Sequence, residues 1–276
     1  MTYSGPDMPR GAGTGKGIVM RVTVKVGTST LAYPTGRLNI RHVEELVKVL
    51  SDLKNAGHEV VLVSSGAIGM GVGKLPLNRR PEDMPTKQAA AAVGQCELMY
   101  TYDRLFTEYN HVVAQILLTG ADFDHEERRI NLENTLFRLL ELEAIPIINE
   151  NDTIATEEIS VGDNDTLGAI VAKCVKSDLL VLLSDIDGLY TADPREDKNA
   201  RFISRVEIIT PEIEALAGGS GTSFGTGGMA TKLHAARIAM QAGFDMVIAN
   251  GARPEILYDI VDGKRVGTRF IGEGNV

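Results

Sequence analysis

The stretch that decides the fold is Asp165–Leu183, DTLGAIVAKCVKSDLLVLL. In its first part apolar residues recur three and four positions apart, which predicts a helix over Asp165–Val175. Its last part, Asp178–Leu183, is a continuous apolar run typical of a strand that is buried on both faces. A helix followed directly by such a strand predicts a parallel sheet covered by helices.

The same alternation extends in both directions from this stretch. Further strands are predicted over Arg21–Val26, Glu59–Val63, His111–Leu118, Ala144–Ile148 and Asp245–Ala249. Further helices are predicted over Ile40–Ala56, Thr86–Tyr109, Arg128–Leu142 and Met229–Ala242. The pattern favours an α/β fold, a three-layer αβα sandwich with an open, mostly parallel central sheet. In such folds the loops at the carboxyl ends of the strands hold the ligands.

Length and local composition suggest one large domain. The 276 residues can bury a sizeable core, and we see no internal repeat or clean linker. Residues 1–19 are rich in Gly, Pro and polar residues and lack periodicity until their last positions, so we expect a flexible N-terminal tail or a remnant of cloning. Residues 20–276 are then expected to form the folded domain.

Charge, hydropathy and cysteine usage exclude several classes of partner. The formal net charge is −9 and there is no long basic run, so nucleic acid and acidic membranes are poor partners. No apolar run reaches the roughly 18 residues that a membrane span needs. Cys96 and Cys174 lie in apolar, helix-like patterns and are expected to be buried free thiols. Because no disulfide framework or metal-ligand spacing is present, a cytoplasmic location is expected.

The glycine-rich run Gly225–Lys232, GTGGMATK, leads directly into a predicted helix. Glycines let a backbone approach a ligand closely, and a helix start offers N–H donors and a positive dipole end to a phosphate. Lys232 would reach the same anion from the first turn of the helix. The run could equally be an ordinary loop followed by a surface lysine.

Two other positions carry charge near predicted strand or helix ends. Lys25 stands near the end of a buried strand and is followed by Gly27, so it could be a second cation or an edge lysine that reaches solvent. Asp163 and Asp165 bracket Asn164 just before a helix. One of these three residues is expected to cap the helix, and a carboxylate there could also orient the two lysines or help to hold a magnesium-bound nucleotide.

Polar side chains also follow two further strands. The cluster Asn149–Asp152 could form local Asx turns, or it could bind the ammonium and carboxylate of an amino acid. Ser65 and Gly66 could bind a carboxylate through a hydroxyl and a backbone N–H. All these loops would meet at one edge of a parallel sheet, and this shared placement is stronger evidence than any single motif.

The segments VKVGTS, VSSGAIG, INENDT, VGDND, LLSDIDGLYTADPR and GTGGMATK occur in this order. They resemble the amino acid kinase family, and in particular its glutamate-phosphorylating branch, from about residue 20 to the C-terminus. Many members of that branch have Thr at the position of Ser184, and many carry an additional C-terminal PUA domain. This chain resembles the short form that lacks the PUA domain.

The resemblance implies a role for each matching residue. Lys25, Lys232 and Asp165 would be catalytic, with the lysines neutralising the transferring phosphoryl group and Asp165 organising them. The residues implied to bind ATP are Lys25, Gly27, Ser184, Asp185, Thr226, Gly227, Gly228, Met229, Ala230, Thr231 and Lys232. The residues implied to bind substrate are Ser65, Gly66, Asn149, Asp152 and Asn164. Metal ligands are not implied.

The implied activity is ATP-dependent phosphorylation of the L-glutamate side-chain carboxylate to L-glutamyl 5-phosphate, the first step of proline biosynthesis. ATP and Mg²⁺ would be the cofactors, proline a possible feedback inhibitor, and the enzyme a homo-oligomer, either a dimer or a tetramer. Two alternatives stay open. One is a sibling kinase acting on N-acetylglutamate or aspartate, and the other is a non-catalytic amino acid sensor on the same fold.

Overall fold

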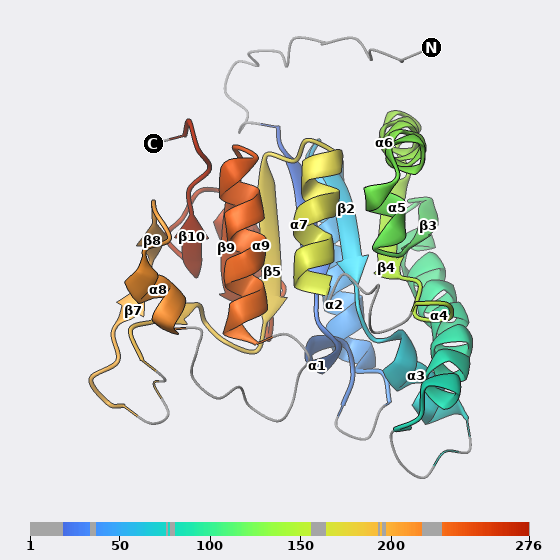
Figure 1. The fold of residues 1–276 in the computed structure, drawn as a ribbon. Coiled ribbons are helices and arrows are strands. Elements are labelled where there is room, and N and C mark those ends of the chain that lie inside the picture. Colours follow the sequence, from blue (N-terminus) through green and yellow to red (C-terminus); the bar gives the residue numbers. More distant parts are fainter. Residues whose placement is uncertain are drawn as a thin grey trace.

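The computed structural model describes residues 19–33, 37–75, 77, 81–155, 164–192, 194, 197–216 and 228–275. An eight-stranded sheet runs through this part of the chain in the order β3-β4-β2-β1-β5-β9-β10-β8 (Figure 1). Its strands are β1 (Arg21–Val26), β2 (Glu59–Ser64), β3 (Val113–Leu118), β4 (Ile145–Glu150), β5 (Leu179–Ser184), β8 (Arg205–Val206), β9 (Asp245–Asn250) and β10 (Thr268–Phe270). Neighbouring strands are parallel except for β9 and β10.

Helices cover both faces of this sheet (Figure 1). One hydrophobic cluster joins the sheet to α2 (Ile40–Asn55), α4 (Met84–Thr107) and α10 (Ile256–Val261). Two clusters on the opposite face include α6 (Glu126–Glu141), α7 (Asn164–Cys174) and α9 (Met229–Gln241). The predicted three-layer αβα sandwich with a mostly parallel sheet is therefore confirmed.

The predicted long helices and core strands are all present, with ends that differ by a few residues at most. The short elements were missed. These are α1 (Thr28–Leu31), α3 (Ala67–Lys74), α5 (Ala121–Asp124), α8 (Pro211–Leu216), α10, the hairpin of β6 (Leu189–Tyr190) and β7 (Phe202–Ile203), β8 and β10. The missed helices have at most eight residues, too few turns for a helical period to show, and the missed strands have only two or three residues, whereas the core strands that were predicted have six residues each.

Strand β1 lies at the centre of the sheet, between β2 and β5. Successive side chains of a strand point to opposite faces, so Val22, Val24 and Val26 share one face and pack in the cluster of α2. Lys25 lies on the other face, under α7, where a Cβ at Gly168 would be 3.4 Å from the Lys25 Cβ. The alternation of side chains along β1 thus places Lys25 under α7, the helix that carries Asp165.

Three further expectations can be compared with the described residues. Cys174 is buried as expected, but Cys96 is exposed, because it lies on the outer face of α4, opposite the stripe that packs on the core. No helix in the described part of the chain is both long and apolar enough to cross a membrane. The expected N-terminal tail lies outside the described residues except for Val19.

Candidate active site

Two lysines meet on one carboxylate at the carboxyl edge of the sheet. The Nζ of Lys25, from β1, lies 2.6 Å from Oδ1 of Asp165, and the Nζ of Lys232, from α9, lies 3.0 Å from Oδ2 of the same residue. Asp165 is 1% exposed, and both lysines are also buried. The three catalytic candidates, which are 140 and 67 residues apart in sequence, therefore form one compact group of charges.

The electrostatics of this group follow from burial and from the two cations. Burial alone would raise the pKa of Asp165, but Lys25 and Lys232 offset that effect and hold the pKa below its ordinary value. The carboxylate is thus ionised at neutral pH, and one negative charge is shared by two ammonium groups. A group with one excess positive charge is suited to an anion such as a phosphoryl group.

The end of the glycine-rich run places the N-terminus of α9 beside this cluster. Gly228 is the N-cap, and Met229 is the first helical residue. The Thr231 hydroxyl is 2.8 Å from the Gly228 carbonyl and 3.2 Å from Oδ2 of Asp165. Ala230 lies in the same first turn. Gly225, Thr226 and Gly227 lie outside the described residues, so their predicted contacts with phosphate are neither confirmed nor contradicted.

On the other side of Lys25, three polar residues and a glycine form an acceptor cluster, by which we mean Ser65, Gly66, Asn149 and Asn164. The Asn164 side-chain nitrogen donates to the Ser65 hydroxyl at 2.6 Å and to Oδ1 of Asn149 at 3.0 Å. Gly66 has a φ of 108°, in the left-handed region that favours glycine, and it caps α3. The chain therefore turns sharply after Ser65 and begins a helix, as an anion site at a helix start requires.

One residue that sequence reasoning missed extends this cluster. Gln95, a buried residue of α4, accepts a hydrogen bond of 3.0 Å from the Asn149 side-chain nitrogen. It stands four residues after Ala91 and three before Leu98, both buried, so it interrupts an apolar stripe of the helix. A polar residue within an apolar helical stripe is the signal that could have identified it.

Asp152 lies in the turn that follows β4, and the backbone N–H of Asn151 anchors this turn to the Leu118 carbonyl at 2.7 Å. Burial raises the pKa of Asp152 above its ordinary value of 3.8. A half-buried carboxylate whose charge is disfavoured by desolvation would gain from a cationic partner, and an amino acid ammonium is such a partner.

Ser184 and Asp185 lie on the opposite side of β1 from the acceptor cluster. Ser184 ends β5, its hydroxyl lies 3.2 Å from Oδ1 of Asp185, and its carbonyl accepts from the backbone N–H of Gly251 at 2.7 Å. In the sheet order, Asn149 lies on β4, Ser65 and Gly66 follow β2, Lys25 lies on β1, and Ser184 and Asp185 lie at and just after the end of β5. The acceptor cluster and the pair Ser184 and Asp185 thus lie on opposite sides of β1, while Gly27, directly after β1, lies beside Lys25.

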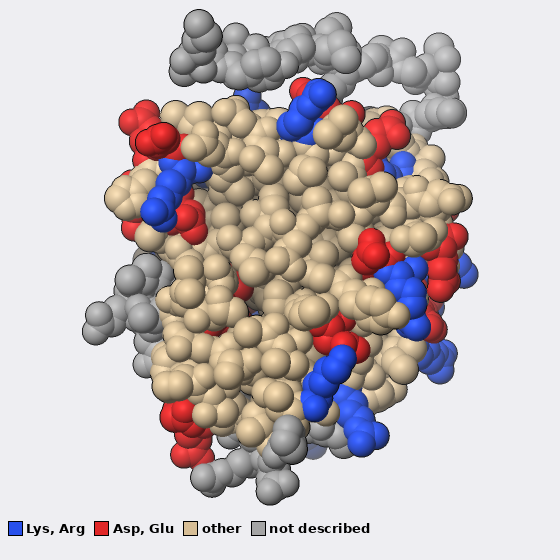
Figure 2. All heavy atoms as spheres, turned by 90° about the vertical axis from the view of Figure 1, so that its right-hand side faces the viewer, with Lys and Arg blue, Asp and Glu red and all other residues tan. Residues whose placement is uncertain are grey.

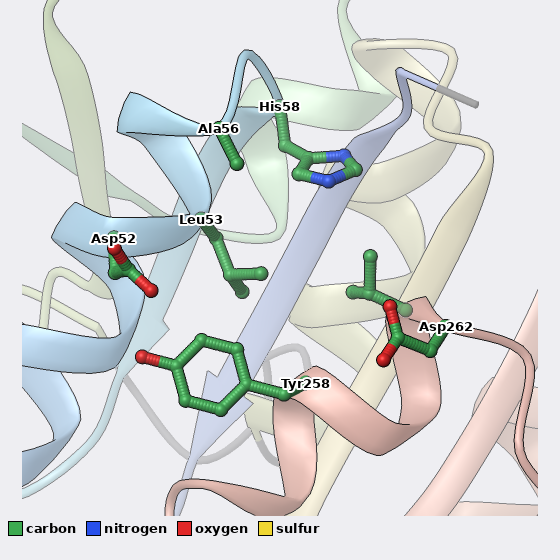
Figure 3. A pocket seen from close by; sticks show the side chains of 7 residues that line it. Asp52, Leu53, Ala56, His58, Tyr258 and Asp262 are labelled. Atoms are coloured by element: carbon green, nitrogen blue, oxygen red, sulfur yellow. The ribbon is translucent and has the colours of Figure 1, made fainter. Parts of the chain in front are cut away.

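A cavity of about 480 Å³ lies at the opposite, amino edge of the sheet (Figure 3). It is lined by the end of α2, by His58 just before β2, and by Tyr258, Val261 and Asp262 from α10 and the residue after it. Burial and a hydrogen bond to Asp52 raise the pKa of Tyr258 to about 12, so the phenol is neutral. None of the predicted site residues lines this cavity.

Comparison with known proteins identifies the family of this chain. Residues 20–250 match the model of the amino acid kinase family. The chain therefore belongs to the amino acid kinase family.

Within this family the chain is similar to glutamate 5-kinases. It is 56% identical over 252 residues to the glutamate 5-kinase of Clostridium tetani, covering 91% of this chain and 94% of that protein. It is 53% identical to the glutamate 5-kinase of Clostridium perfringens, covering 92% and 96% of the two chains. A third glutamate 5-kinase, from Carboxydothermus hydrogenoformans, is 54% identical, and 68% of its length is covered. The resemblance predicted from the motifs is confirmed.

Solved structures support the fold alone, because their sequences are distant. Carbamate kinase from Giardia lamblia superposes with a TM-score of 0.65 at 18% identity, covering 92% of this chain and 99% of that chain. UMP kinase from Ureaplasma parvum superposes with a TM-score of 0.63 at 15% identity, with the same shares covered.

Proposed function

We propose that this protein transfers the terminal phosphoryl group of ATP to the side-chain carboxylate of L-glutamate, giving L-glutamyl 5-phosphate and ADP as the first step of proline biosynthesis. The observation that carries the proposal is at the start of α7. Asn164 belongs to the acceptor cluster, where it bonds to Ser65 and Asn149, and the next residue, Asp165, holds both lysines. Adjacent residues of one helix therefore join an amino acid subsite to a phosphate subsite. The similarity to glutamate 5-kinases supports glutamate as the acceptor.

The reaction needs charge neutralisation more than proton transfer. A glutamate side chain has a pKa of about 4.3, so the nucleophile is already ionised at pH 7 and no general base is required. A carboxylate oxygen attacks the terminal phosphorus, the bond from that phosphorus to the bridging oxygen breaks, and ADP leaves with the electron pair. Both reactants are anions, so Lys25 and Lys232 act by neutralising charge on the transferring group while Asp165 fixes their positions.

ATP would lie over the ends of β5 and α9, with its phosphates directed at Lys25 and Lys232 and with Ser184 and Asp185 at the nucleotide. Magnesium is proposed to enter as the Mg·ATP complex and to neutralise phosphate charge. Within the described residues no group of three His, Cys, Asp or Glu side chains could hold a metal ion. Asp165 is already engaged by two lysines, so the phosphates and water would supply most of the Mg²⁺ ligands.

Glutamate would place its side-chain carboxylate near Lys25 and its ammonium between Asp152 and Asn164. The free ammonium separates glutamate from N-acetylglutamate, which lacks the positive charge that a carboxylate at Asp152 favours. The test is ADP release in a coupled assay with glutamate, aspartate and N-acetylglutamate, each with and without proline, the proposed inhibitor. Turnover of another acceptor in preference to glutamate identifies a sibling kinase, and binding of glutamate without turnover identifies a sensor.

We further propose that residues 20–276 act as one cytoplasmic amino acid kinase domain that forms a homo-oligomer, either a dimer or a tetramer. Figure 2 shows the face formed by β3, α4, α5 and α6, whose centre holds few charged side chains while Lys, Arg, Asp and Glu gather around it. Exposed apolar side chains of these elements and their flanking loops are Tyr100, Tyr109, Val112 and Leu142. Light scattering of the wild type and of Tyr100→Glu tests whether this face joins two copies.

A further inference from the structure

A chain of side-chain amides connects α4 to the acceptor cluster. From it we infer that Gln95 is a positioning residue, which acts through Asn149 to make Asn164 present an oxygen acceptor to the substrate ammonium. The inference rests on the proposed glutamate kinase function. It concerns a residue that lies behind the site rather than one that contacts substrate.

The direction of each hydrogen bond in this chain is set by one backbone group. The backbone N–H of Glu150 donates to Oδ1 of Asn149 at 2.9 Å. A backbone N–H can only donate, so this bond identifies which end of the Asn149 amide is the oxygen. The atom of Asn164 that lies 3.0 Å from the same oxygen must then be its nitrogen. That nitrogen donates its second hydrogen to the Ser65 hydroxyl, 2.6 Å away.

Because the Asn164 nitrogen faces Asn149 and Ser65, the oxygen of the same amide points away from both. This Oδ1 is buried and has no hydrogen-bond partner within the described part of the chain. A buried acceptor without a donor costs about 1–3 kcal/mol, and a donor supplied by a ligand removes that cost. An ammonium is such a donor, whereas a carboxylate is not. The direction of the hydrogen bonds in this chain of amides therefore favours a substrate that carries an ammonium group.

Gln95 maintains this direction of the hydrogen bonds from the other side of Asn149. Its Oε1 accepts from the Asn149 side-chain nitrogen at 3.0 Å, and its own nitrogen lies 3.4 Å from Oε1 of Gln115. Without Gln95 the Asn149 nitrogen would be buried without an acceptor. Asn149 could not flip to compensate, because the Glu150 N–H needs its oxygen. Asn149 would have to rotate away and release Asn164.

The backbone that carries Gln95 is closely packed beside the site. The preceding residue, Gly94, lies where α4 crosses α3, and a Cβ there would be 1.7 Å from the Ala67 carbonyl oxygen. Ala67 is the first residue of α3, directly after Gly66 of the acceptor cluster. Close backbone packing thus fixes the distance from Gln95 to Asn149. The hydrogen bond from Asn149 to the Gln95 side chain then fixes the orientation of the Asn149 amide.

The experiment compares two variants of Gln95 with a control on the same helix. Gln95→Met keeps the side-chain length and removes the acceptor, and Gln95→Glu keeps an oxygen that can accept. Thr101→Val is the control, because Thr101 is buried to the same extent and bonds only to Glu97 of its own helix in the described contacts. Steady-state kinetics give kcat and KM for glutamate and ATP, and inhibition gives Ki for glutarate, which is glutamate without the ammonium.

We expect Gln95→Met to raise KM for glutamate about tenfold, with kcat, KM for ATP and the Ki of glutarate changed by less than about threefold. Gln95→Glu should lie within about threefold of wild type, as should Thr101→Val. The inference is overturned if Gln95→Met leaves KM for glutamate unchanged, if Gln95→Glu is equally impaired, or if glutarate binding weakens by the same factor. Absence of glutamate turnover in the wild type would instead overturn the proposed function.

Discussion

The two halves of the candidate site are built from different chemistry. The phosphate half, formed by Lys25, Asp165 and Lys232, consists of full charges held 2.6 and 3.0 Å apart. The acceptor half, formed around Asn149 and Asn164, consists mainly of neutral amides and a hydroxyl. Positive charge stabilises the transition state in which one anion attacks another, whereas directed hydrogen bonds bind the substrate before the reaction. Damage to the first half should therefore lower kcat, and damage to the second should raise KM for glutamate.

The largest effect is expected from the lysines. Lys25→Met and Lys232→Met keep most of the side-chain length and remove the positive charge, so each should lower kcat by about three orders of magnitude. The measurement is kcat at saturating ATP and glutamate. Lys173→Met, on an exposed position of α7, is the matched control and should retain wild-type kcat. Turnover within threefold of wild type in both lysine variants would remove these residues from the mechanism.

Asp165→Asn should affect both catalysis and stability. It removes the only negative charge that the structure places between the two lysines within the described residues, so we expect kcat to fall by about 100-fold and the free energy of unfolding to fall by about 3–5 kcal/mol at pH 7. An unaltered unfolding midpoint would show that Asp165 does not hold the lysines together.

The stability effect of Asp165→Asn should depend on pH with a defined sign. The pKa of Asp165 in the folded protein lies below its ordinary value of 3.8, so the ionised carboxylate stabilises the fold above that pH. This contribution is lost as the pH falls from 3.8 through the lower folded value. The difference in unfolding free energy between wild type and variant should therefore shrink below about pH 4 in denaturant titrations.

The sequence pointed to all three residues of the phosphate half, whereas around the acceptor half it missed Gln95, for a physical reason. Lys25 stands near the end of a buried strand and Lys232 follows a glycine-rich helix start, and each pattern has a local cause that can be seen in the sequence. The alternation of strands and helices predicted a mostly parallel sheet with these residues at one edge, but not the order of its strands. The polar position of Gln95 within an apolar helical stripe is visible in the sequence, but its partner Asn149, 54 residues away, is not. Short elements such as α3 were missed although α3 shapes the site.

Asp152→Asn tests the acceptor half with a moderate effect. The ammonium of glutamate would lose a charged partner, so KM for glutamate should rise about 10- to 100-fold, with KM for ATP unchanged. Because burial raises the pKa of Asp152 above 3.8, the wild-type KM for glutamate should already rise as the pH falls towards that raised pKa, and the variant should lack this rise. A selective rise of KM for ATP would reverse the two subsites.

The same substitution should stabilise the protein without ligands. A carboxyl whose folded pKa is raised makes the fold less stable as the pH increases through that pKa, because the unfolded chain ionises more readily. Asp152→Asn removes this penalty, so its unfolding temperature at pH 7 should exceed that of wild type when glutamate is absent. With saturating glutamate the order should reverse, since only the wild type binds the ligand tightly.

The smallest effect is expected at Ser184, on the nucleotide side of β1. Its hydroxyl, 3.2 Å from the Asp185 carboxylate, is a neutral group, and a single such hydrogen bond contributes about 0.5–1.5 kcal/mol. Ser184→Ala should therefore raise KM for ATP by about two- to tenfold, while Ser184→Thr, which keeps the hydroxyl, should match wild type. Steady-state kinetics with ATP as the varied substrate measure both. Since β1 separates Ser184 from the acceptor cluster, KM for glutamate should not move in either variant, and a parallel rise would show that the two halves are not independent.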